Sequence, residues 1–248
     1  MIKEHWNNCA ENYGELIRDS LSGTDVENWK KFIFNDIDEK RELNILDIGT
    51  GPGFFPIILS SENRKVIGID LSDKMLEQAK RNLMLNNVDA ELIQMDCQKT
   101  SFKDNSFDLI ICRNLTWTLT EPLKAYEEWH RILKKGGKLM IFDGSWYIHH
   151  YDTKAMNDFQ KKEEELQRKY GIKAHNYGDK ELYPEDYKLM KSLYLSDKLR
   201  PDWDSVSLND IGFNVIKIQN NYLDEIMSKE EMEKMDSISP VFYILAEK

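Results

Sequence analysis

From Leu43 onward, short apolar runs rich in β-branched residues alternate with stretches of helical periodicity, and this alternation limits the fold more than any other feature. Each run is apolar on both faces, as strands buried inside a parallel sheet are. Alternating strands and helices predict a parallel sheet wound with crossover helices. The expected strands are 44–48, 65–70, 91–95, 107–112, 138–143, 214–219 and 241–246. The sequence therefore predicts an α/β fold with a doubly wound, seven-stranded, mostly parallel sheet.

Two parts of the chain fall outside this alternation and predict helical lids. Residues 1–40 carry aromatic and apolar side chains in helical stretches, which we expect to lie over the core or over a site. The strand pattern stops after Asp143, and we interpret 146–205 as a mostly helical insertion at the same edge of the sheet. The core domain would then consist of 41–145 and 206–248.

Net charge and cysteine content limit the classes of binding partner and the cellular compartment that we expect. Among 248 residues, 34 Lys and Arg stand against 44 Asp and Glu, and the net charge of −10 repels nucleic-acid backbones. The 3 cysteines lack C-x-x-C spacing and cannot all pair, which is typical of a reducing cytosol. The sequence has neither an apolar run near the ~18 residues of a membrane span nor a signal-peptide core. We therefore expect a cytoplasmic protein without nucleic-acid or membrane partners, whose oligomeric state stays open.

A glycine loop follows the first expected strand directly. The sequence G-T-G-P-G at Gly49 to Gly53 leads into a helix start with Pro56 in its first turns. Such a turn lets the backbone approach a ligand closely and points free helix N–H groups at it. The dinucleotide fingerprint needs a third glycine at position 54, which is Phe54, and the P-loop tail Gly-Lys-Ser/Thr is also missing. The loop therefore favours a different nucleotide or amino-acid ligand.

Aspartates stand at or near the ends of three strands beside this loop. Asp70 ends the second strand, where an acidic side chain accepts from both hydroxyls of an adenosine ribose. Asp96 follows the third strand, where it can accept from an adenine amino group. Asp47 lies in the first strand, just before the glycines. Because the carboxyl ends of parallel strands share one edge, the three carboxylates are expected to line one rim.

Over 44–143, these residues resemble the class I S-adenosylmethionine-dependent methyltransferases of the small-molecule type, related to quinone-biosynthesis methyltransferases. The resemblance rests on four ordered segments: D-I-G-T-G-P-G from Asp47, D-L-S-D-K-M-L-E-Q-A from Asp70, F-D-L-I-I-C-R-N from Phe107, and E-E-W-H-R-I-L-K-K-G-G-K-L from Glu127. It implies a Rossmann-like fold, S-adenosyl-L-methionine as the cofactor, and methyl transfer to a small organic acceptor through N, O, S or C.

The resemblance also implies a set of cofactor-binding residues. Gly49 and Gly51 would pass under the methionine part, Asp70 would hold the ribose, and Leu71 and Met75 would flank the adenine. Asp96 and Cys97 would meet the adenine edge, the backbone carbonyl of Arg113 would face the methionine amino group, and Tyr13 would close over the cofactor. The implied set is Tyr13, Asp47, Gly49, Gly51, Gly53, Asp70, Leu71, Met75, Asp96, Cys97 and Arg113.

The acceptor is expected over the carboxyl ends of the fourth and fifth strands. A general base there would be His149 or His150, at most one of them, since neighbouring helical residues point in different directions; surface or packing roles are the alternative. Trp6, Trp117, Trp146 and Tyr147 would form an aromatic cage for a flat or cationic acceptor, or would pack in the core. Other candidates are Trp6, Asn114, Thr116, Trp117, Asp143, Trp146 and Tyr147, with Tyr170, Tyr177, Tyr183 and Trp203 from the insertion as a roof.

Two other functions compete with methyl transfer. A protein that binds the cofactor without catalysis would explain why no base is identifiable, and T-W-T around Trp117 departs from the polar residue that the family often carries there. A nicotinamide-dependent oxidoreductase is disfavoured by Phe54. A metal site is not expected, because H-H-Y-D after Ile148 lacks a second cluster of ligands.

Overall fold

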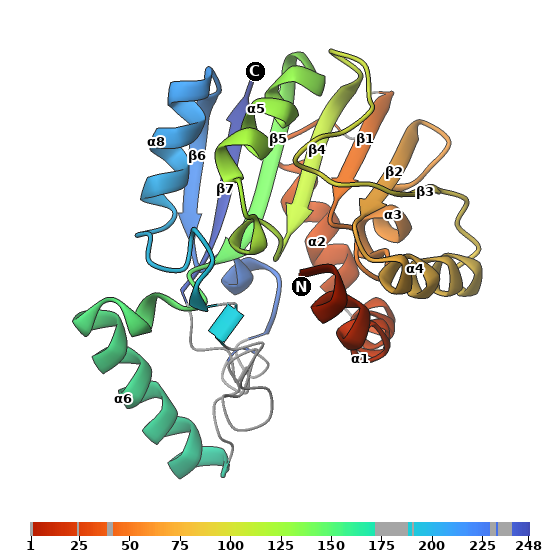
Figure 1. Ribbon diagram of the computed structural model, residues 1–248. Helices are drawn as coiled ribbons and strands as arrows, with labels where there is room; N and C mark the ends of the chain where they lie inside the picture. The colour runs from red at the N-terminus through yellow and green to blue at the C-terminus, as the bar shows by residue number, and fades with distance from the viewer. Residues whose placement is uncertain are drawn as a thin grey trace.

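A seven-stranded sheet forms the centre of the computed structural model, which describes residues 2–23, 25–38, 42–171, 188–189, 191–228, 232 and 240–248. The strand order is β3-β2-β1-β4-β5-β7-β6, and only β7 runs antiparallel to its neighbours (Figure 1). The strands are β1 Leu43–Ile48, β2 Arg64–Asp70, β3 Glu91–Gln94, β4 Phe107–Arg113, β5 Leu133–Gly144, β6 Asn214–Asn220 and β7 Val241–Glu247. The predicted fold class is confirmed.

Helices cover both faces of the sheet, which explains why the central strands are apolar on both sides. On one face, α2 (Asp25–Phe34) and α3 (Phe54–Leu59) pack an aromatic cluster that includes Trp29, Phe55 and Phe142. On the other face, α5 (Pro122–Ile132) and α8 (Asp202–Ile211) bury Trp129 and Leu208. The parallel strands all end at one edge, and this edge carries the loops that are free to bind a ligand.

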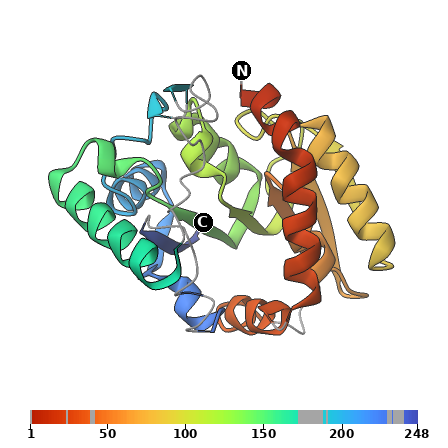
Figure 2. The same ribbon diagram turned by 90° about the horizontal axis from the view of Figure 1, so that it is seen from below.

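The N-terminal helix α1 (Ile2–Ser22) lies beside α4 (Asp73–Leu85) at that edge, and Figure 2 shows the two side by side. Gly14 permits the close approach, because a Cβ there would meet Gln78 Oε1 at 2.6 Å. Lys3 forms an ion pair with Asp73 at 2.8 Å. Helix α1 is thus held at the carboxyl edge by contacts along its length.

The segment after β5 divides into an outlying helix and a core helix. Helix α6 (Thr153–Tyr170), capped by Asp152, projects away from the sheet (Figure 1). Helix α8 already begins at Asp202 and packs on the sheet, so the core resumes earlier than the expected boundary at 205. The roof candidates Tyr177 and Tyr183 lie outside the described residues. Within the described ranges, no helix is both long and apolar enough to cross a membrane.

Candidate functional site

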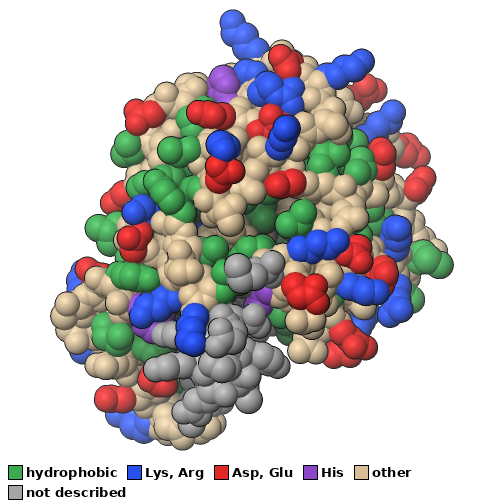
Figure 3. Space-filling view, viewed as in Figure 1, with side chains coloured by type: hydrophobic (Ala, Val, Ile, Leu, Met, Phe, Trp, Pro, Cys, Tyr) green, Lys and Arg blue, Asp and Glu red, His purple; other side chains and the backbone are tan. Residues whose placement is uncertain are grey.

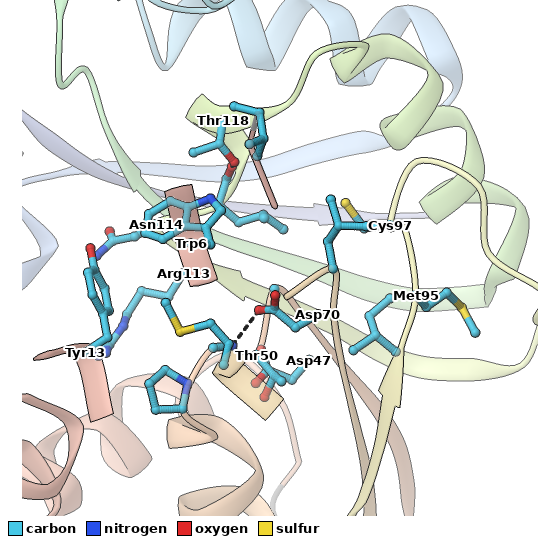
Figure 4. A pocket seen from close by; sticks show the side chains of 18 of the residues that line it. Trp6, Tyr13, Asp47, Thr50, Asp70, Met95, Cys97, Arg113, Asn114 and Thr118 are labelled. Carbon is cyan, nitrogen blue, oxygen red and sulfur yellow. Dashed lines mark hydrogen bonds between the residues drawn. The ribbon is translucent and has the colours of Figure 1, made fainter. Parts of the chain in front are cut away.

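A cavity of about 320 Å³ opens at the carboxyl edge, between the glycine loop and helix α1. Figure 4 shows Met95 and Cys97 at one end, Tyr13 and Arg113 at the other, and Asp70 between them. Its lining comprises Ile2, Trp6, Tyr13, Ile17, Asp47, Gly49, Thr50, Gly51, Pro52, Phe54, Phe55, Ile69, Asp70, Leu71, Met75, Met95, Asp96, Cys97, Gln98, Arg113, Asn114, Leu115, Thr118, Leu119 and Thr120. The cavity therefore brings together all but one of the cofactor-binding residues expected from the sequence.

The glycine loop exposes its backbone to the cavity. Gly51 has φ +50°, and a Cβ there would meet no atom of the described residues within 4 Å. Gly49 has φ +67°, and its Cβ would collide with the Leu115 side chain at 2.7 Å. Only glycine adopts these left-handed conformations without strain. At Gly51 the space that a side chain would fill is thus open to a ligand, whereas at Gly49 the missing side chain makes room for Leu115.

Gly53 is the exception among the expected cofactor-binding residues. It does not line the cavity; it precedes α3 with φ +87°, and a Cβ there would meet Leu83 at 2.9 Å and Ala79 at 3.2 Å. Gly53 therefore serves the close packing of the loop on α4, which the glycine spacing alone did not distinguish from ligand binding.

Asp70 joins the glycine loop to the end of β2. Its carboxylate accepts hydrogen bonds from the backbone N–H of Gly51 at 2.9 Å and from that of Ser72 at 2.8 Å. Burial raises the pKa of Asp70 to about 6, and these two N–H donors oppose the rise. Since each oxygen has a further lone pair, the carboxylate has the capacity to accept additional hydrogen bonds.

Asp47, which lies beside Asp70 in Figure 4, and Arg113 provide opposite charges in the lining of the cavity. Asp47 is 2% exposed, and burial raises its pKa to about 7, although the positive charge of Arg113 acts against this shift. The Arg113 guanidinium lies over the ring of Phe54, 4.5 Å from its centroid. Phe54 was not predicted to line the cavity, although it had been singled out from the sequence as the residue that excludes the dinucleotide fingerprint. The side chain of Arg113, and not only its backbone, therefore shapes this part of the cavity.

Helix α1 contributes more lining residues than the sequence indicated. Tyr13 and Trp6 were expected, whereas Ile2 and Ile17 were missed. The four occur at helical spacing on one face of α1, which is the signal that would have found the other two. Trp6 meets Tyr13 edge-on at 5.6 Å between ring centroids.

Of the other expected acceptor residues, Asn114 lines the cavity and five do not: Thr116, Trp117, Asp143, Trp146 and Tyr147. Trp117 packs edge-on against Trp6 at 6.1 Å, and Tyr147 lies against Trp117 at 5.7 Å. Trp146 packs among core residues, and Asp143 is 0% exposed. Trp117, Trp146 and Tyr147 therefore pack against other side chains and do not form a cage in the cavity. Packing in a cluster removes more of their apolar ring surface from water than an open cavity would.

Neither candidate base reaches the cavity. His149 lines a second cavity between α6 and residues 220–224, where it stacks on Phe159 at 4.3 Å between ring centroids. Burial lowers its pKa to about 4, and the nearby charges of His150 and Lys191 act in the same direction. His150 stacks on Tyr147 at 6.2 Å.

The described roof candidates also lie elsewhere. Trp203 packs against Tyr126 at 6.4 Å and Tyr194 at 5.6 Å between ring centroids, in the cluster under α5 and α8. Tyr170 is the last residue of the outlying helix α6. Neither Trp203 nor Tyr170 lines the cavity between the glycine loop and α1. Among the described residues, no cluster of three or more His, Cys, Asp or Glu side chains could hold a metal ion.

Comparison with known proteins agrees with this geometry. Residues 46–141 match the family model for a methyltransferase domain. The chain is 27% identical over 229 residues to the ubiquinone/menaquinone biosynthesis C-methyltransferase of Salmonella arizonae, covering 89% of this chain and 85% of the relative. A SAM-dependent methyltransferase structure from Aquifex aeolicus shares the fold with a TM-score of 0.57 at 18% identity, covering 95% of this chain and 98% of that one. The [4+2]-cyclase SpnF shares it with a TM-score of 0.57 at 15% identity, covering 88% and 79%.

Fold, cavity and family match together define a class I S-adenosylmethionine-dependent methyltransferase. Within that class, the chain is related to the methyltransferases of quinone biosynthesis. Its cofactor is S-adenosyl-L-methionine. The residues present fit this molecule, since a cradle of exposed glycine backbone lies among the carboxylates of Asp47, Asp70 and Asp96, and the cofactor is positively charged at sulfur.

Proposed function

We propose that this enzyme transfers a methyl group to a small organic acceptor by in-line displacement. The observation that carries the proposal is the cover that α1 provides: it brings Trp6 and Tyr13 into the lining of the cavity, together with the glycine loop. A concave site of about 320 Å³, narrowed by the aromatic side chains of α1, favours a small molecule over a polymer. On the face in Figure 3, acidic and basic side chains are interspersed, and the net charge of −10 also argues against a nucleic-acid acceptor.

The chain's own residues divide the work of binding. Asp70 would accept from the ribose hydroxyls, and Leu71 and Met75 would flank the adenine, with Asp96 at its edge. Asp47 and the backbone carbonyl of Arg113 would hold the methionine end. All of these residues line the cavity, and the role given to each is the one that the resemblance to the family implies.

Catalysis by such a site consists mainly of alignment and exclusion of water. S-adenosylmethionine supplies a methyl group that its positively charged sulfur already makes electrophilic. Tyr13, Asn114 and Thr118 would orient the acceptor, and the apolar side chains of α1 would exclude solvent. Because His149 and His150 lie off the cavity, the favoured acceptor is one that arrives deprotonated or is nucleophilic without a base.

The test is methyl transfer from methyl-labelled cofactor to 1,4-naphthohydroquinone, thiophenol and benzylamine, which represent C or O, S and N acceptors. The quinol is included because the Salmonella relative is named for quinone biosynthesis. Transfer to at least one supports the proposal. Calorimetric binding of S-adenosylmethionine without transfer to any of them, or to a small-molecule extract, favours a non-catalytic binding protein.

We also infer that the protein works in a reducing compartment such as the cytoplasm. The inference rests on Cys9, Cys97 and Cys112, none of which forms a disulfide. Mass spectrometry of thiol-alkylated protein from its native cells tests it, because an oxidised pair would contradict it.

A further inference from the structure

The buried carboxylate of Asp143 connects two loops on the acceptor side of the cavity. Asp143 lies near the end of β5, and its Oδ1 accepts hydrogen bonds from the backbone N–H of Gly144 at 2.8 Å and from Trp146 Nε1 at 2.9 Å. Its Oδ2 accepts from the backbone N–H of Trp117 at 3.1 Å and from the Thr116 hydroxyl. With four donors on two oxygens and no exposed surface, this carboxylate has no room for an acceptor.

A second group of buried charges holds Asp143 in turn. Arg200 Nη1 lies 3.6 Å from Asp143 Oδ2, and Arg200 Nη2 donates to the hydroxyl of Thr116. Asp204 pairs with the same guanidinium through two hydrogen bonds of 2.8 Å, and Tyr126 donates to Asp204. The Thr116 hydroxyl therefore accepts from Arg200 and donates to Asp143, which fixes its orientation.

The network reaches the cavity through residues 114–118. Trp117 Nε1 donates to the backbone carbonyl of Asn114 at 3.0 Å, and Asn114 and Thr118 line the cavity. The Trp117 ring also packs against Trp6, so helix α1 rests on the same segment. A displaced carboxylate at Asp143 would consequently move both the wall and the helix that covers it.

We propose that Asp143 is a positioning residue for methyl transfer, which acts through Thr116 and Trp117 to hold the acceptor side of the cavity in place. The inference rests on the proposed methyl transfer. It replaces the expectation that Asp143 touches the acceptor, because its oxygens are taken up by the chain itself. On the cofactor side, the carboxylate of Asp70 is hydrogen-bonded to Gly51 and Ser72 and not to this network, although Leu115 packs against Gly49.

The test uses variants that alter the network with little change in shape. Thr116→Val removes the hydroxyl, Thr116→Ser retains it, and Asp143→Asn replaces one acceptor oxygen with a donor. Thr100→Val is the matched control, because the Thr100 hydroxyl likewise donates to a carboxylate, that of Glu128, but lines no part of the cavity.

We expect Thr116→Val and Asp143→Asn to lower kcat/KM for the best of the three probe acceptors by about tenfold to a hundredfold, because small misplacements cost that much. Calorimetric affinity for S-adenosylmethionine should change less than about twofold, and Thr116→Ser and Thr100→Val should resemble wild type. Unchanged kcat/KM in folded Thr116→Val, a parallel loss of cofactor affinity, or an equal defect in Thr116→Ser would overturn the proposal.

A second readout does not depend on turnover. In ¹⁵N–¹H spectra, the indole N–H signals of Trp117 and Trp146 should shift in Thr116→Val and Asp143→Asn, while that of Trp129, bonded to the Cys97 carbonyl, stays in place. If wild type methylates neither the probes nor a small-molecule extract, the proposed function fails, and these signals still show whether Asp143 and Thr116 hold this segment in place. Unmoved Trp117 and Trp146 signals in both variants would overturn it.

Discussion

The carboxylate of Asp70 accepts a hydrogen bond of 2.9 Å from the backbone N–H of Gly51, although the two residues lie at the ends of different strands. This bond fixes the glycine loop against β2 on the floor of the cavity. The loop conformation and the expected ribose contact therefore depend on the same side chain. Removing the Asp70 carboxylate should therefore change both the conformation of the glycine loop in the free protein and the affinity for the cofactor.

Asp70→Ala should weaken S-adenosylmethionine binding by about 1 to 3 kcal/mol, because charge-assisted hydrogen bonds to the ligand are lost and the loop is released. Isothermal calorimetry measures the change. Asp104→Asn, which alters an exposed aspartate paired with Arg131 away from the cavity, is the control. Equal affinity in Asp70→Ala and the control would contradict the ribose role.

Cofactor affinity should rise with pH between about 5 and 8 and then level off. The pKa values of Asp47 and Asp70, about 7 and about 6, lie above the ordinary 3.8, so both carboxyls are partly protonated in this range in the free protein. A cationic ligand favours their ionised forms, and binding must therefore release protons. Calorimetry at pH 6 in buffers of different ionisation enthalpy counts these protons; a flat affinity profile without proton release would refute the explanation.

Gly51→Ala should lower both stability and cofactor affinity, whereas Gly171→Ala should lower stability alone. Both glycines have positive φ values, +50° and +66°, and a Cβ at either meets no described atom within 4 Å. The shared backbone strain costs about 1 to 2 kcal/mol in each variant. Only at Gly51 does the new methyl group enter the cavity, so thermal melts with and without cofactor separate the two effects. Equal affinities in the two variants would show that the loop does not cradle the ligand.

Asn7→Ala should speed the dissociation of S-adenosylmethionine. The hydroxyl of Ser72 donates to Asn7 Oδ1 at 2.6 Å and ties α1 to the start of α4, next to Asp70. One such bond contributes about 0.5 to 1.5 kcal/mol, which corresponds to a roughly twofold to tenfold faster release in stopped-flow experiments. Lys3→Ala, which removes an exposed ion pair on the same helix, should have a smaller effect. If the two variants release cofactor at the same rate, α1 is not held through Asn7.

His149→Gln should retain methyl transfer, because the ring stacks on Phe159 in a separate cavity. A lost general base would instead lower kcat by about 10² to 10⁴. His149 should also weaken the wild-type fold in acid: its folded pKa of about 4 lies below the ordinary 6.5, so the unfolded chain binds more protons and stability falls as pH drops through this range. Urea denaturation from pH 7 to pH 4 should show a smaller loss in His149→Gln than in wild type.

The sequence by itself determined the sheet, the glycine turn and the aspartates beside it. Strand periodicity and the turn are local properties, and the rule that parallel strands end at one edge converts three separate aspartates into one rim. These residues by themselves indicate a nucleotide or amino-acid ligand, and the identity of the cofactor came from the resemblance of the surrounding segments to a known family.

Only the tertiary structure decided which polar and aromatic residues line the cavity. Trp6 and Trp117 look alike in sequence, yet one faces the cavity and the other packs behind it. Asp143 reads as a binding residue until Thr116 and Arg200, distant along the chain, are seen to surround it. The same types of side chain serve for packing and for binding. Which of the two a residue does depends on whether partners distant along the chain bury it, and no local sequence pattern encodes those partners.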